Sequence, residues 1–67
     1  MQVSVNGKTL ELIQSENIFG LLRLVDITSP SGIAVAVNNT VIAKKDWEIY
    51  IIQENDQVTL IRATQGG

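Results

Sequence analysis

The chain has 67 residues, of which 45% are hydrophobic and 18% charged, and its formal net charge at pH 7 is −2. This length allows one domain with one hydrophobic core, and the composition is typical of a folded globular unit rather than a disordered chain. Because the chain contains neither Cys nor His, disulfides, zinc sites of the usual ligand types, and thiol or imidazole catalysis are excluded.

The charge pattern and the apolar runs exclude two further classes of partner. The five basic residues are scattered along the chain and form no stripe that could follow a phosphate backbone, so we expect no nucleic-acid partner. No apolar run approaches the roughly 20 residues needed to cross a bilayer, and the N-terminal segment lacks the apolar region of a signal peptide. We therefore expect no membrane partner and a cytoplasmic or organelle-internal location.

Residues 1–12, MQVSVNGKTLEL, predict a β-hairpin. Asn6-Gly7 favours a two-residue turn of the primed type, which pairs Val5 with Lys8 and sets the register of both strands. Alternation then places apolar side chains on one face of the hairpin, namely Met1, Val3, Val5, Leu10 and Leu12. This face is expected to cover a core.

The next segment, SENIFGLLRLVD, changes to helical periodicity. Its apolar residues recur at i, i+3, i+4 and i+7, at Ile18, Leu21, Leu22 and Val25. This is the pattern of a helix that packs one face on an apolar surface. Ser15 or Asn17 is the predicted N-cap, and Pro30 and Gly32 indicate a loop after the helix.

Residues 33–43, IAVAVNNTVIA, predict a second hairpin. Asn38 and Asn39 tolerate the left-handed backbone that a tight turn requires. The nearly continuous apolar run from Ile33 to Val37 predicts a strand that is covered on both faces or shielded at an edge.

The segment KKDWEIYIIQEND is predicted to be irregular. Asp46 is the expected cap of a short helical turn through Trp47 and Glu48, followed by an extended piece around residues 50–52. Trp47 is expected to be a core anchor. Lys44-Lys45 is interpreted as a solvated edge.

The last predicted elements are a turn at ENDQ and a strand at QVTLIRAT. In this strand Val58 and Leu60 face one side, and Thr59 and Ile61 face the other. The order of hairpin, helix, hairpin, short turn and strand predicts an α+β fold, with one helix across one face of a mixed sheet of four to five strands. Residues 1–63 form the predicted domain, and residues 64–67 form a predicted flexible tail.

Two pairs of carboxylates are candidates for acid–base chemistry, Glu54 with Asp56 and Asp46 with Glu48. Because they lie in predicted turns, we interpret them as solvated or capping groups, and no catalytic residue is predicted.

The C-terminal Gly66-Gly67 favours a different chemistry. Residues 63–67, if extended, reach roughly 15 Å beyond the sheet at about 3.3 Å per residue, and glycine makes the chain thin enough to enter a narrow channel. The terminal carboxylate can attack the α-phosphate of ATP, and no side chain would obstruct a nucleophile at the resulting acyl-adenylate. The tail is therefore a candidate reactive arm.

Two stretches, IAVAVNNTVIAKKDW and ENDQVTLIRATQGG, together resemble the ThiS family of ubiquitin-like sulfur carriers. The resemblance covers nearly the whole chain. The sequence departs from the family's common pattern at residues 42–44, Ile-Ala-Lys in place of Val-Pro-Arg, at residues 55–56, Asn-Asp in place of Gly-Asp, and at Gln65, where a small residue is frequent.

The resemblance implies a β-grasp fold, with the first and last strands side by side and the helix across the sheet. It also implies that Gly67 is adenylated and converted to a thiocarboxylate, while Gly66 and Gln65 thread into a partner. A ThiF-type adenylating enzyme would use ATP and magnesium, a persulfide would donate sulfur, and a ThiG-type thiazole synthase would receive it. The chain would be a protein co-substrate rather than an enzyme, with no cofactor or metal of its own. Ile61 and Ala63 are candidate contact residues because they lie close to the tail.

Three alternatives stay open from the sequence. The chain could be a sulfur carrier of the kind that forms the small subunit of molybdopterin synthase, which has the same fold and the same Gly-Gly end. It could also be a modifier conjugated to lysines or a carrier in tRNA thiolation. A structural β-grasp module with incidental glycines is the third.

Overall fold

The computed structural model describes residues 1–27 and 31–62. In chain order its elements are β1 (Gln2–Val5), β2 (Lys8–Glu11), α1 (Ile18–Leu24), β3 (Ile33–Val37), β4 (Thr40–Ile42), the short 3₁₀ helix η1 (Lys44–Asp46) and β5 (Gln57–Arg62). Among the described residues, no helix is long and apolar enough to cross a membrane.

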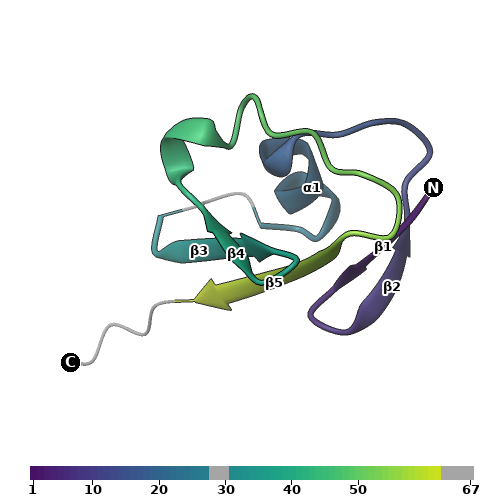
Figure 1. The fold of residues 1–67 in the computed structure, drawn as a ribbon, viewed down its shortest axis with the longest axis horizontal. Coiled ribbons are helices and arrows are strands. Elements are labelled where there is room, and N and C mark those ends of the chain that lie inside the picture. Colours follow the sequence, from purple (N-terminus) through teal and green to yellow (C-terminus); the bar gives the residue numbers. More distant parts are fainter. Residues whose placement is uncertain (28–30, 63–67) are drawn as a thin grey trace.

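The five strands form one mixed sheet in the order β2-β1-β5-β3-β4. β1 and β5 are parallel neighbours at its centre, and the two hairpins extend the sheet on either side. Helix α1 crosses one face of this sheet (Figure 1). This is the predicted β-grasp arrangement, in which the first and last strands lie side by side.

The first hairpin has the predicted register. Val5 pairs with Lys8 and Val3 with Leu10, and Asn6 and Gly7 both have positive φ, 51° and 83°. Such values characterise the primed turns whose twist matches that of the flanking strands. The apolar face of the hairpin therefore packs on the core, where Val3 is only 3% exposed.

Helix α1 begins after Asn17, which acts as the N-cap. The Asn17 side-chain oxygen accepts a hydrogen bond from Gly20 N at 2.8 Å, so of the two predicted caps the structure uses Asn17. The predicted apolar stripe faces the sheet, with Ile18, Leu21 and Leu22 at most 2% exposed. Burial of this stripe stabilises a helix of seven residues, which is too short to be stable alone.

The second hairpin also forms, with positive φ at Asn38 and Asn39. The prediction for β3 was wrong in one respect, because this strand is neither covered on both faces nor at an edge. It lies between β4 and β5, and its apolar run continues onto the open face through small residues, the exposed Ala34 and the largely buried Ala36.

The segment after β4 differs from its prediction at the start. The helical turn begins at Lys44, with Ala43 in the N-cap position and no side-chain cap, so Asp46 ends the 3₁₀ helix rather than capping it. The predicted extended piece is present as an isolated bridge between Ile51 and Asn17.

Trp47 is the anchor of this segment, as predicted, and is 1% exposed. Its indole Nε1 donates a hydrogen bond to the Ile42 carbonyl at 2.9 Å, and its ring meets Phe19 edge-on with centroids 5.5 Å apart. The indole thus contributes a large apolar surface while its one polar atom is satisfied. It joins η1, α1 and the end of β4.

Candidate functional site

The candidate site begins where β5 ends. β5 is the central strand, paired in parallel with β1 and antiparallel to β3 up to Ile33 opposite Arg62. Pairing with β3 extends to Arg62, whereas pairing with β1 ends at Val58, so β3 holds the last residues of β5. The predicted tail residues Gln65, Gly66 and Gly67, and the predicted contact residue Ala63, lie outside the described residues.

Side chains from two turns also hold β5 in place. The Asn6 side-chain oxygen accepts a hydrogen bond from Leu60 N at 2.8 Å, and the Asn38 side-chain oxygen accepts one from Gln57 N at 2.9 Å. Asn38 in turn donates to the Asp56 carboxylate at 3.0 Å. The sequence analysis recognised both asparagines only as turn formers, because their contacts to β5 span 54 and 19 residues.

The predicted contact residue Ile61 lies on the sheet face opposite α1 and is 52% exposed. Its cross-strand partner is Ala34, and next to this pair Ala36 lies between Val41 and Thr59. Since successive side chains on a strand alternate between faces, these five residues share the open face. We call them the open-face patch: Ala34, Ala36, Val41, Thr59 and Ile61.

Of the candidate carboxylate pairs, Glu54 and Asp56 accept hydrogen bonds from within the fold, and we interpret them as structural. Asp56 is 6% exposed, and besides the bond from Asn38 it accepts one from Gln53 N at 2.7 Å. Glu54 accepts a bond from Gln2 N at 3.2 Å. Within residues 1–27 and 31–62, no group of three or more acidic side chains is placed to hold a metal ion.

The resolved pKa shifts belong to one ion pair far from the candidate site. The ammonium of Met1 lies 2.8 Å from the Glu11 carboxylate. This hydrogen bond lowers the pKa of Glu11 and raises the pKa of the Met1 amine. The pair lies at the β2 side of the sheet, remote from β4, and we interpret it as structural.

Two shallow grooves flank the sheet. One, of about 450 Å³, lies between the first hairpin and the end of α1 and is lined by Val5, Asn6, Lys8, Thr9, Leu10, Val25, Ile27 and Leu60. The other, of about 500 Å³, follows β4, and we call it the edge groove; it is lined by Val41, Ile42, Ala43, Asp46, Ile49 and Tyr50. No periodic pattern in the sequence indicates the edge groove, because Ile49 and Tyr50 lie in an irregular segment.

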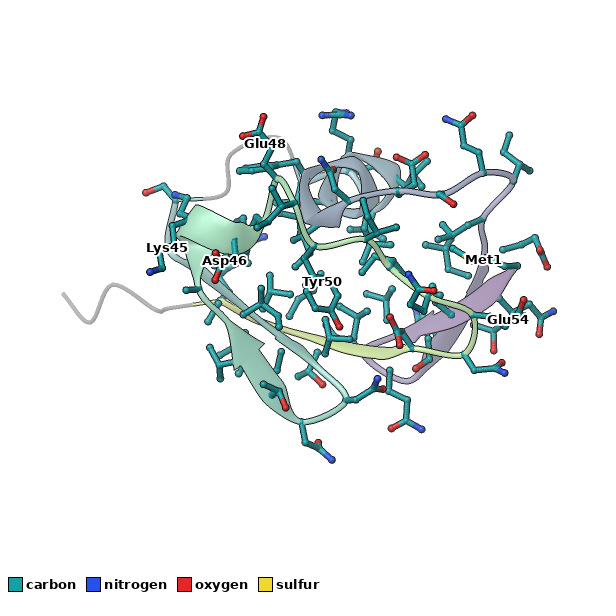
Figure 2. The ribbon with its side chains drawn as sticks, turned by 45° about the horizontal axis from the view of Figure 1, so that its top comes forward. Met1, Lys45, Asp46, Glu48, Tyr50 and Glu54 are labelled. Atoms are coloured by element: carbon teal, nitrogen blue, oxygen red, sulfur yellow. The ribbon has the colours of Figure 1, made fainter. Side chains whose placement is uncertain are left out.

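In Figure 2, Asp46 at the end of η1 and Tyr50 in the segment after it lie on the sheet side, whereas Glu48 points away from the sheet. The predicted solvated pair Lys44-Lys45 is exposed. The Lys44 ammonium lies 5.8 Å from the centroid of Trp47, a distance at which a cation and an aromatic ring attract each other.

Comparison with known proteins places this geometry in a family context. The model of the ThiS family matches residues 3–67. The sulfur carrier protein ThiS of Escherichia coli strain K12 is 27% identical over 67 residues, and the alignment covers all of both chains. An uncharacterized protein, ycf40 of Trieres chinensis, is 30% identical over 63 residues, which are 94% of this chain and 85% of that protein.

Solved structures share the fold. The crystal structure of the thiamine biosynthesis protein ThiS from Geobacter metallireducens matches with a TM-score of 0.85 and 23% identity over all of both chains. An NMR solution structure of a thiamine biosynthesis protein from the same organism matches with a TM-score of 0.80 and 25% identity, covering all of this chain and 88% of that one.

Proposed function

The chain belongs to the ThiS family, and we propose that it is a sulfur carrier of thiamin biosynthesis in which Gly67 bears the transferred sulfur. The observation that carries the proposal is the family match, which runs through the last strand to the final glycine. A second support is the similarity over its full length to the sulfur carrier protein of Escherichia coli.

The proposed chemistry takes place on the terminal carboxylate. One oxygen of the Gly67 carboxylate attacks the α-phosphate of ATP, and pyrophosphate leaves. The terminal sulfur of a persulfide then attacks the acyl carbon and AMP leaves, after which a thiol cleaves the S–S bond and releases the thiocarboxylate. ATP and magnesium belong to the adenylating partner, and a thiazole synthase is the proposed acceptor of the sulfur.

The proposed role of this chain is to present the Gly67 carboxylate to the adenylating enzyme. The end of β5 is held by antiparallel pairing with β3 up to Arg62, and positioning of a reacting group by a fixed strand lowers the entropic part of a reaction barrier. Gly66 and Gly67 lack Cβ atoms and leave the acyl carbon open to attack.

The test is the intact mass of the chain after incubation with a thiazole-pathway adenylating enzyme, ATP, magnesium and sulfide. We expect the mass gain that corresponds to replacement of one oxygen by sulfur, located at Gly67 by fragmentation. No gain with an enzyme that is active on its own carrier would contradict the proposal. Sulfur delivery to a molybdopterin synthase, and not to a thiazole synthase, would instead reassign the pathway.

The open-face patch is the proposed docking surface for the adenylating enzyme, because it is mostly apolar, is exposed except at Ala36, and includes residues of the last strand. Ile61→Asp places a charge in this patch and should reduce adenylation at least tenfold, since one buried unpaired charge costs more than about 1.4 kcal/mol. Thr9→Asp, on the same face at the β2 edge, is the matched control and should retain adenylation. Unchanged adenylation of folded Ile61→Asp would remove this surface.

A further inference from the structure

The two free edges of the sheet differ in chemistry. β2 is one edge and β4 is the other. β2 begins with Lys8 and ends with Glu11, and charges on an edge strand discourage another strand from pairing with it. β4 consists of Thr40, Val41 and Ile42 and carries no charge. The β4 edge therefore lacks the charged protection of the β2 edge.

The backbone of Val41 is available at this edge. The two-residue turn makes Val37 and Thr40 the closing hydrogen-bonded pair of the hairpin, and such pairs alternate with non-hydrogen-bonded ones. Val41, opposite Ala36, is thus in a non-hydrogen-bonded pair, and its N–H and C=O point away from β3. Across the described part of the chain, no backbone hydrogen bond outside the strand pairs reaches Val41.

The edge groove provides a place for the side chains of an added strand. Val41 and Ile49 on its walls are 69% and 74% exposed, and Asp46 is the only charged residue among the described residues that line it. No hydrogen bond or ion pair to the Asp46 carboxylate occurs within residues 1–27 and 31–62. The groove is therefore largely apolar and holds one half-buried carboxylate.

We propose that β4 is a strand-addition site, where an extended segment of the adenylating partner pairs with Val41 and places apolar side chains and one basic side chain in the edge groove. This proposal rests on the proposed function. Backbone pairing supplies affinity in such complexes, and pockets beside the strand supply specificity. A basic side chain is the complement of the half-buried Asp46 carboxylate. A second copy of this chain fits less well, because its β4 carries no cation for Asp46.

Val41 belongs to both the edge groove and the open-face patch. One partner can therefore cover the open face and extend the sheet at the same time. The proposal makes the β4 edge a second determinant of partner choice, separate from the tail.

The first test is Val41→Pro, which removes the outward N–H without breaking a bond to β3. Proline is tolerated on edge strands where the N–H faces solvent. We expect the Kd for the adenylating enzyme, measured by titration calorimetry, to rise about tenfold through the lost hydrogen bond. Thr9→Pro is the matched control, because Thr9 occupies the equivalent non-hydrogen-bonded position on β2; its Kd should stay that of the wild type.

A second pair of variants tests the groove without touching the backbone. Ile49→Asp should raise the Kd at least tenfold, whereas Ile13→Asp should not change it, although Ile13 is 98% exposed and receives the same charge. Asp46→Asn should raise the Kd about threefold and weaken its dependence on salt, because it removes one charge pair. Both exposed isoleucines can accept Asp without loss of the fold.

Amide hydrogen exchange distinguishes strand addition from simple apolar contact. The Val41 amide should exchange rapidly in the free chain and at least tenfold more slowly in the complex, while the Thr9 amide should exchange rapidly in both. If the wild-type chain is adenylated and bound, and Val41→Pro and Ile49→Asp bind equally well, strand addition is overturned while the proposed function stands. A chain that is neither adenylated nor bound would overturn the proposed function with it. A protected Val41 amide in a homodimer of the free chain would make a second copy the occupant and also overturn the proposal.

Discussion

At the scale of single residues, the buried carboxylate of Asp56 joins two turns. It accepts hydrogen bonds from the Asn38 side chain and from Gln53 N, so Asp56→Ala would leave two donors without partners. We expect a loss of roughly 2 kcal/mol in the free energy of unfolding, measured by urea denaturation. Glu48→Ala, at an exposed carboxylate, should change it by less than about 0.5 kcal/mol. Equal losses for the two variants would show that the Asp56 carboxylate behaves as a surface charge and does not hold the two turns together.

The ion pair between Met1 and Glu11 makes a pH-dependent contribution. The pKa of Glu11 is lowered from its usual 4.5, so its stabilisation is present above that pH and is lost as the pH falls through the lowered folded value. The pKa of the amine is raised from 8.0, so its stabilisation is present below pH 8.0 and is lost as the pH rises through the raised value.

Glu11→Gln should therefore lower the melting temperature most between the two usual pKa values. The difference from the wild type should shrink toward both acid and alkaline pH, and added salt should reduce it, because the pair is exposed. Melting curves from pH 2 to pH 10 measure this profile. A difference that is independent of pH would mean that Glu11 acts through packing.

At the scale of elements, the turn of the second hairpin combines two separable effects. Asn38 and Asn39 both have left-handed φ, 51° and 71°, and an alanine there costs roughly 1 kcal/mol of backbone strain. Only Asn38 also bonds Asp56 and Gln57. Asn39→Ala should thus cost about 1 kcal/mol and Asn38→Ala roughly 2 to 3 kcal/mol, while Asn39→Gly should be neutral or stabilising. Equal losses of unfolding free energy for the two alanine variants in urea denaturation would show that the hydrogen bonds of Asn38 to Asp56 and Gln57 add no stability.

Both hairpins, the helix and the register of the first hairpin could be predicted, because each is determined by local chemistry: an Asn-containing turn, a two-residue alternation or a 3.6-residue period. The start of η1 at Lys44 could not, because that turn forms around the burial of Trp47, whose ring packs on Phe19 in a distant part of the sequence. The position of β3 between β4 and β5 could not be predicted either. Ala34 and Ala36 are small enough for the open face of the sheet. An apolar run alone does not distinguish an open face from a face that is covered by a second layer.

At the scale of the whole molecule, the sequence predicted one residue of the candidate surface, Ile61, only from its closeness to the C-terminal residues. The alternation of the last strand left open whether Val58 and Leu60 or Thr59 and Ile61 would face the core, and the structure leaves Ile61 52% exposed. The edge groove could not be predicted, because it forms where β4 and residues 46–50 meet in space. It requires a strand order that places β4 at the edge of the sheet.

The division between the packed domain and the tail predicts that stability and activity can be separated. The core residues of the described part of the chain lie between Val3 and Val58, and glycine has no side chain that could bury apolar surface, so deletion of Gly66 and Gly67 should leave the melting temperature within about 2 °C of the wild type. The same deletion should abolish sulfur acceptance, because it removes the carboxylate that is adenylated. Gly67→Ala is the graded variant, since it keeps a carboxylate but adds a methyl group beside the reacting carbon, and it should be adenylated more slowly. Calorimetry and the intact-mass assay measure the two properties on the same samples. A large fall in melting temperature on deletion would mean that the last residues pack on the domain, and retained sulfur acceptance would place the reactive group elsewhere in the chain.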